Sequence, residues 1–360
     1  MTGRARGVLV SPSSPPAAAA TDPQPVGNEA VLRRLIETYH ADRLHHCLIL
    51  EGPRGVGKAA AARRLAMLVN CDGPAELLGP RTTPCGECWS CRHIARGEHP
   101  DIIEIGLDPE RATPIISVRQ ARALLGALQL HPFHARQRFV IIDPADAMTQ
   151  EAANALLKTL EEPPTRTGFI LITERTSDLL PTVRSRSQRV RFGPVEVERV
   201  AAWLDLDDPR RAWEAAVLSD GCPDRARELV DGELDRWRQV RDELVAVLRG
   251  PTPERLAWTE KQARGDRDAV RQRLDRILDI VSRLARDCLR LEAGSPSSVL
   301  YNADQPELIA AMNRRLGPAG VARVDAAVAE ARRELEANVN NRLALDALLA
   351  VLHRELGGRA

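Results

Sequence analysis

Residues 52–58 read Gly-Pro-Arg-Gly-Val-Gly-Lys, which has the glycine and lysine spacing of a phosphate-binding P-loop. In such a loop the glycines let backbone N–H groups approach phosphates, and the lysine neutralises their charge. An apolar run at 47–50 precedes the loop, and an Ala/Leu-rich helical stretch at 58–69 follows it. This order predicts a nucleotide-binding α/β fold, and an ordinary Gly-rich turn is the alternative. The predicted phosphate-binding residues are Gly52, Gly55, Gly57 and Lys58.

The groups that would handle Mg²⁺ and water are incomplete. Ala59 stands where a working P-loop has the Ser or Thr that binds Mg²⁺. A second apolar strand, at 139–142, ends in Asp143, where P-loop enzymes place a carboxylate near Mg²⁺, but Pro144 has no side-chain base to activate water. The next strand ends at Thr173, which is either a γ-phosphate contact or a simple strand-end hydroxyl. We therefore expect a site that could still bind ATP and Mg²⁺ but does not hydrolyse ATP.

A cluster of thiols lies between the first two strands. The four predicted metal ligands are Cys71, Cys85, Cys88 and Cys91. Tetrahedral Zn²⁺ accepts four thiolates, and spacings of two residues let a tight turn present sulfur atoms to one ion. With no open coordination position, this zinc site would be structural. Disulfides are the alternative, but we expect no secretory signal, and a reducing cytosol disfavours them.

Composition indicates a large protein without a strong electrostatic preference. The 360 residues are 44% hydrophobic, which is enough for two or three domains with buried cores. The 51 basic and 50 acidic residues leave a formal net charge of +1, so there is no global attraction to DNA or to anionic membranes. No apolar run is long enough to span a bilayer, and we expect a cytoplasmic protein with no membrane partner.

Residues 151–164 read Glu-Ala-Ala-Asn-Ala-Leu-Leu-Lys-Thr-Leu-Glu-Glu-Pro-Pro, an apolar stripe at helical spacing that ends at prolines. Further motifs are His46 ahead of the P-loop strand, His-Pro-Asp at 99–101 and Arg-Ser-Arg-Ser at 184–187. Together with the P-loop and the four cysteines, these motifs resemble the clamp-loader subunits of bacterial DNA polymerase III, in the AAA+ superfamily. The resemblance covers nearly all of the chain after residue 26, including the stretch that begins at Asn338.

The resemblance implies an organisation into domains. It implies an AAA+ α/β core with a parallel sheet over 27–193, a zinc-binding insertion at about 71–91, a small helical lid over 194–233 and an all-α oligomerisation collar over 234–360. Residues 1–26 are rich in Pro and Ala and are expected to be a flexible tail. Apolar stripes at helical spacing mark the collar, although a self-contained helical bundle would need the same stripes. They are Val270, Leu274, Ile277, Leu278, Val281, Leu284 and Cys288, then Val321, Val324, Val328, Ala331 and Leu335.

Within this family, the departures at Ala59 and Pro144 are similar to those of the delta-prime branch, whose members do not hydrolyse ATP and close one end of a five-subunit ring. The resemblance also implies that Arg186 reaches in trans into the ATP site of a neighbouring motor subunit, with Ser187 standing where the family has cysteine. A guanidinium stays charged and can stabilise charge that develops on a γ-phosphate. A surface arginine in a salt bridge is the alternative for Arg186.

A third departure lies in the predicted lid, where Asp224 takes the place of a nucleotide-contacting arginine of the motors and Arg225 follows one residue later. The implied partners are the gamma/tau motor subunits, the delta subunit, the sliding clamp and, through the complex, primer-template DNA. Two other functions stay open at this point. The chain could be a gamma/tau-like active ATPase with unusual substitutions, or a zinc-bearing AAA+ adaptor outside replication.

Overall fold

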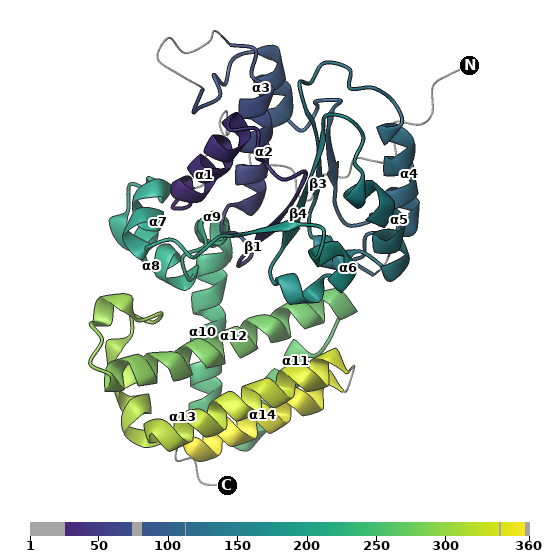
Figure 1. Ribbon diagram of the computed structural model, residues 1–360. Helices are drawn as coiled ribbons and strands as arrows, with labels where there is room; N and C mark the ends of the chain where they lie inside the picture. Colours follow the sequence, from purple (N-terminus) through teal and green to yellow (C-terminus); the bar gives the residue numbers. More distant parts are fainter. Residues whose placement is uncertain (1–25, 74–80, 112, 338–339, 357–360) are drawn as a thin grey trace. The chain divides into compact units, whose positions relative to one another are not determined.

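The computed structural model describes residues 26–73, 81–111, 113–337 and 340–356 (Figure 1). The predicted tail therefore lies outside the described residues except for Val26, as does Asn338 at the start of the last predicted collar stretch. The chain divides into two compact units. Among the described residues, the P-loop unit comprises residues 26–204 and 220–225, and the helical unit comprises residues 205–219 and 226–356, with the gaps given above.

The P-loop unit contains a parallel sheet with the strand order β2-β3-β4-β1-β5. The strands are β1 (Cys47–Glu51), β2 (Ile102–Ile105), β3 (Arg138–Ile142), β4 (Thr167–Thr173) and β5 (Gln188–Arg191). The helices are α1 (Glu29–His40), α2 (Lys58–Val69), α3 (Trp89–Ala95), α4 (Val118–Leu128), α5 (Gln150–Glu161), α6 (Pro181–Arg184) and α7 (Val197–Leu204). The predicted parallel sheet is confirmed, and the three strands expected from apolar runs are β1, β3 and β4.

Helices cover both faces of this sheet (Figure 1). Side chains alternate along a strand, so Leu48 and Leu50 of β1 pack under α1, α2 and α3, whereas Ile49 packs under α4 and α5. The apolar stripe of α5 lies in the second of these cores, as its spacing predicts, with Leu156 and Leu160 buried. Two-sided burial explains why the central strands are continuously apolar.

Asp101, just before β2, organises the loop that leads into β3. Its carboxylate is 2% exposed and accepts backbone N–H bonds from Phe133, His134 and Ala135 at 2.8, 2.8 and 2.9 Å. Arg138 lies 3.5 Å from the same carboxylate. Burial alone would raise the pKa of Asp101, but these backbone hydrogen bonds and Arg138 outweigh burial and lower the pKa.

The helical unit consists mainly of α-helices. They are α8 (Pro209–Leu218), α10 (Leu234–Arg249), α11 (Thr252–Gln262), α12 (Arg267–Glu292), α13 (Pro306–Glu336) and α14 (Asn341–Glu355). Both predicted apolar stripes are buried, one on α12 and one on α13. Helix α13 bends at Gly317, which has φ 54° and precedes Pro318. The predicted lid, 194–233, contains α7, α8 and α9 (Pro223–Glu228), which the two units divide between them, and its boundaries stay a prediction.

Buried polar contacts tie the segment before α13 to α12 and to α10 within the helical unit. Asp287 is fully buried and accepts hydrogen bonds from the backbone N–H of Tyr301 and of Asn302, both at 2.9 Å. The side chain of Arg241 forms a two-pronged ion pair with Asp304 at 2.7 and 2.8 Å. These bonds satisfy groups that would otherwise be costly to bury.

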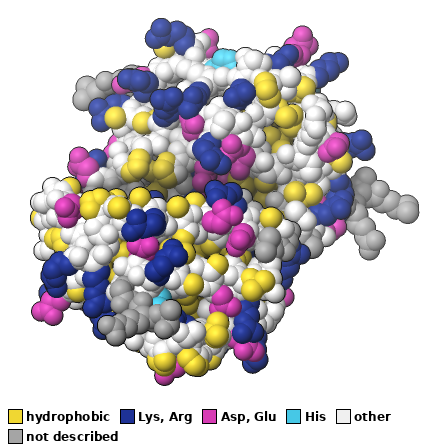
Figure 2. Space-filling model, turned by 90° about the horizontal axis from the view of Figure 1, so that it is seen from below, with side chains coloured by type: hydrophobic (Ala, Val, Ile, Leu, Met, Phe, Trp, Pro, Cys, Tyr) yellow, Lys and Arg dark blue, Asp and Glu magenta, His cyan; other side chains and the backbone are white. Residues whose placement is uncertain are grey.

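The surface mixes charges of both signs. On the face drawn in Figure 2, basic and acidic side chains are interspersed, with apolar side chains between them. This pattern agrees with the near-zero formal net charge. Among the described residues, no helix combines the length and the apolar character that crossing a membrane requires.

We predict that Asp101→Asn lowers the free energy of unfolding by about 2–4 kcal/mol at neutral pH. An amide has only one acceptor oxygen and no negative charge, so it cannot replace the carboxylate in all three backbone hydrogen bonds. Folding lowers the pKa of Asp101 below its ordinary 3.8, so its contribution is present above that pH and is lost as the pH falls through the lowered value. Urea unfolding at several pH values should show the two proteins converging below pH 3.8. An equal loss from the exposed Asp207→Asn would contradict a specific role.

Candidate functional site

The P-loop adopts a backbone that requires glycine. Gly52, Gly55 and Gly57 have φ values of 152°, 78° and 90°, and Gly57 caps the N-terminus of α2 in a left-handed conformation. A Cβ atom on Gly52 would lie 2.2 Å from the carbonyl oxygen of Phe192. The spacing of glycines in the sequence is thus matched by three positions where the chain turns sharply before the helix.

Lys58 is buried at the start of α2 and turns back onto the loop. Its Nζ donates to the carbonyl oxygens of Gly52 at 2.5 Å and Pro53 at 2.7 Å, and the residue is 6% exposed. Burial lowers the pKa of Lys58, and the negative charge of Asp143 opposes this effect. These bonds use two of the three N–H donors of the ammonium group.

Asp143 and Ala59 line a small hollow at the carboxyl ends of β2 and β3. Burial raises the pKa of Asp143, while the charges of Lys58 and Arg63 oppose the rise. Arg63, one helical turn beyond Ala59, forms a two-pronged ion pair with Glu104 at 2.7 and 2.6 Å, and both also line the hollow. The methyl group of Ala59 therefore stands where a metal-binding hydroxyl is expected, and a fixed cation lies beside it.

Thr173, the last predicted nucleotide contact, and the predicted lid segment both form bonds within the chain. Thr173 is buried at the end of β4, and its hydroxyl donates to the Arg175 carbonyl at 3.1 Å. In the predicted lid segment, the backbone N–H of Asp224 donates to the Gly55 carbonyl at 3.0 Å, while Arg225 lies 3.8 Å from Asp220. The start of α9 thus packs directly on the P-loop through its backbone.

Arg186 follows α6 and is about one-third exposed. Its guanidinium pairs with Glu161, the last residue of α5, and its Nη1 donates to the Thr182 carbonyl at 2.9 Å and to Ser185 Oγ at 3.3 Å. Ser187, the residue in place of the family's cysteine, donates instead to the Val183 carbonyl at 2.8 Å. Arg186 is therefore partly exposed, and it bonds to Glu161, Thr182 and Ser185 and not to the P-loop.

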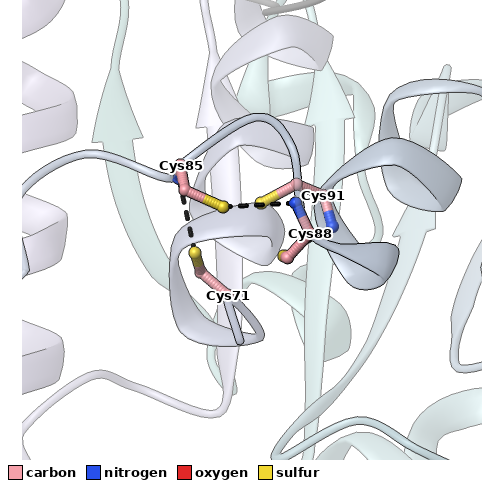
Figure 3. Close-up of side chains that lie close together, drawn as sticks. All are labelled: Cys71, Cys85, Cys88 and Cys91. Atoms are coloured by element: carbon pink, nitrogen blue, oxygen red, sulfur yellow. Dashed lines mark hydrogen bonds between the residues drawn. The ribbon is translucent and has the colours of Figure 1, made fainter. Parts of the chain in front are cut away.

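The four predicted cysteine ligands come together. Cys71 follows α2, Cys85 precedes α3, Cys88 is the N-cap of α3, and Cys91 lies in its first turn. Their four sulfur atoms lie within 4.8 Å of one another and face one another in Figure 3. Four thiolates about 2.3 Å from one tetrahedral ion satisfy that spacing, so this cluster could hold a metal such as zinc.

Backbone N–H groups point at these sulfur atoms. Cys71 Sγ accepts from the Cys85 N–H, Cys85 Sγ accepts from the Cys88 N–H, and Cys88 Sγ accepts from the Cys91 N–H, at 3.3 to 3.4 Å. Burial tends to raise the pKa of Cys85, but these and neighbouring hydrogen bonds lower it to about 7. Such bonds favour the thiolate form that binds metal.

Comparison with known proteins identifies the family. A family model described as "DNA polymerase III, delta subunit" matches residues 27–196, and one for the C-terminal part of that subunit matches residues 269–354. The chain is 31% identical to DNA polymerase III subunit delta' of Pseudomonas aeruginosa, over 84% of this chain and 90% of that protein. It is 30% identical to the Escherichia coli delta' subunit, over 89% and 92%. The chain belongs to the delta' family of DNA polymerase III subunits.

The delta' family is not the only similar group. The chain is also 30% identical to DNA polymerase III subunit tau of Salmonella typhimurium, over 87% of this chain but only 47% of that protein. It thus spans about half the length of that tau relative and about nine tenths of the delta' relatives. The match therefore extends over most of both chains for these delta' relatives, but not for this tau relative.

Two charged contacts at the candidate sites were missed by sequence reasoning. The Arg63–Glu104 pair joins residues 41 positions apart, and Glu161 pairs with Arg186 across 25 positions. The sequence places Glu161 on the polar face of a helix, which identifies its exposure and not its partner. No local spacing rule could have found either pair.

We predict that this chain binds one zinc ion and that Cys88→Ser abolishes tight binding, because the serine hydroxyl is a poor replacement for a thiolate. The variant should also lose stability, since the energy of binding a structural metal contributes to folding. Metal analysis of the purified protein and thermal unfolding with and without a chelator would measure both effects.

Cys288→Ser is the matched control, because Cys288 is a buried thiol of the helical unit outside the cluster. It should keep the zinc. A metal-free wild-type protein with fewer than seven reactive thiols after denaturation would contradict the zinc site and support the disulfide alternative.

Proposed function

We propose that this chain is a non-hydrolysing subunit of the DNA polymerase III clamp loader, which supplies Arg186 in trans to the ATP site of an adjacent motor subunit. In the cytoplasm it would assemble with gamma/tau motors and delta, and help load the sliding clamp onto primed DNA. Its own role would be to provide rigidity and geometry. The observation that carries this proposal is a preserved P-loop fold in which Ala59 and Pro144 replace the groups for metal binding and water activation.

Charge and position support Arg186 as an arginine finger, that is, an arginine that acts on the ATP bound to a neighbouring subunit. A guanidinium keeps its positive charge at any physiological pH, and its planar fork suits phosphate oxygens. Arg186 is partly exposed and lies two residues after the end of α6, whereas Lys58 is buried against its own loop. A partner chain could thus reach the arginine without access to this chain's nucleotide site.

A gamma/tau-like motor remains the second candidate, favoured by the identity to tau and by the retained Lys58. Such a motor would need another ligand for Mg²⁺ and another base for water. Among the described residues that line the hollow beside Ala59, the carboxylates are Asp143 and Glu104, and Glu104 is already paired with Arg63. The arrangement therefore favours the non-hydrolysing role.

We predict that Arg186→Ala slows ATP cleavage at the motor site that faces this chain by about 10³-fold, the lower end of arginine-finger effects. Turnover of a complex reconstituted with motors, delta, clamp and primed DNA should fall to the level that the other sites support. Single-turnover ATP cleavage in the reconstituted complex would measure this.

Arg184→Ala is the matched control, because Arg184 is exposed and forms no ion pair with the residues that the structure describes. This control should leave turnover unchanged. If Arg186→Ala also leaves DNA-dependent turnover unchanged in a complex that still assembles, Arg186 is not the finger.

A further inference from the structure

The guanidinium of Arg186 is engaged within its own chain. Its Nε donates to Glu161, its Nη1 donates to the Thr182 carbonyl and to Ser185 Oγ, and its Nη2 lies in ion-pair contact with the same oxygen of Glu161. All three nitrogen atoms of the guanidinium therefore contact partners within the chain. A guanidinium in this state cannot also grip a phosphate with a two-pronged contact.

Glu161 is the last residue of α5, and a hydrogen bond from outside the helix anchors this end of α5. The Leu160 carbonyl lies 2.9 Å from His46 Nε2, which must donate because a carbonyl oxygen only accepts. This bond fixes the last turn of α5 next to the start of β1. A helix C-terminus carries partial negative charge, so a carboxylate there is unfavourable by itself and gains from a nearby cation. Arg186 is that cation.

We propose that Glu161 is a positioning residue that holds Arg186 in a parked orientation, meaning the orientation in which its guanidinium is paired within its own chain. The arginine reaches a neighbouring γ-phosphate only by exchanging the carboxylate of Glu161 for phosphate oxygens. This inference rests on the proposed trans role of Arg186 and adds its regulation. The carboxylate cancels the charge of the finger while no nucleotide is opposite, so the neighbouring site is not activated before the subunits close.

The exposure of the pair makes this exchange feasible. The side chains of Arg186 and Glu161 are 33% and 45% exposed, and ion pairs with that much solvent contact are weak. A γ-phosphate carries more negative charge than a carboxylate and offers three oxygens, so it can displace Glu161. Arg184, on the other side of Ser185, has no ion pair with any described residue, so the hold is specific to the proposed finger.

The test uses the reconstituted complex with Glu161→Gln in the full chain, a change that keeps the size of the side chain and removes its charge. ATP turnover in the absence of clamp and DNA should rise about two- to fivefold, because the parked state loses the stability of a weak ion pair. Glu161→Asp, which keeps the charge, should stay nearer to the wild-type rate. An unchanged or slower rate for Glu161→Gln would overturn the inference.

Glu162→Gln is the matched control, because it removes the same charge one residue later and Glu162 forms no ion pair with the described part of the chain. Turnover should be unchanged in this variant. The double variant Glu161→Gln/Arg186→Ala should turn over at the rate of Arg186→Ala alone. If Glu161→Gln still changes turnover when Arg186 is already alanine, Glu161 has a general structural role, and the inference is overturned.

These variants separate the two hypotheses. If Arg186→Ala leaves turnover unchanged, the proposed trans role is wrong. If Arg186→Ala slows turnover while Glu161→Gln has no effect, only the parking role of Glu161 is wrong. Equal urea unfolding midpoints for all variants would establish that the differences come from the finger.

Discussion

Parallel strands bring their carboxyl ends to one edge of a sheet, and this constraint assembles the proposed nucleotide site of the chain. The register sets Glu51 at the end of β1 opposite Thr173 at the end of β4, and the Gly52 N–H donates to the Thr173 carbonyl. Asp143 extends β3 at the same edge. The backbone therefore sets the geometry of this edge, whatever side chains occupy it. This is why a fold can survive the loss of the residues that handle magnesium and water.

Charge is distributed differently at the two functional positions. At the P-loop, burial lowers the pKa of Lys58 and raises that of Asp143, and each group's charge opposes the shift of the other. At the surface, the guanidinium of Arg186 is paired with Glu161, and both side chains are partly exposed. A buried, internally compensated site suits a structural role, whereas a partly exposed cation suits action on another chain.

Much of the fold could be predicted from the sequence, because local patterns carry it. The apolar runs became β1, β3 and β4, and the cysteine spacing predicted a cluster whose four sulfur atoms converge. The contacts that specify partners could not be predicted. Asp101 accepts backbone bonds from residues more than 30 positions away, and Glu161 meets Arg186 through tertiary packing alone. Periodicity indicates which face of a helix is exposed but not which side chain it meets.

The central claim is that this chain cannot cleave ATP itself and acts on the site of a neighbour. The most direct measurement is Mg²⁺-dependent ATP hydrolysis by the isolated chain, compared with its Lys58→Ala variant. We expect both proteins to give the same rate, at the level of the uncatalysed background. Hydrolysis by the isolated chain that is well above background and is abolished by Lys58→Ala would contradict the claim and identify an active motor.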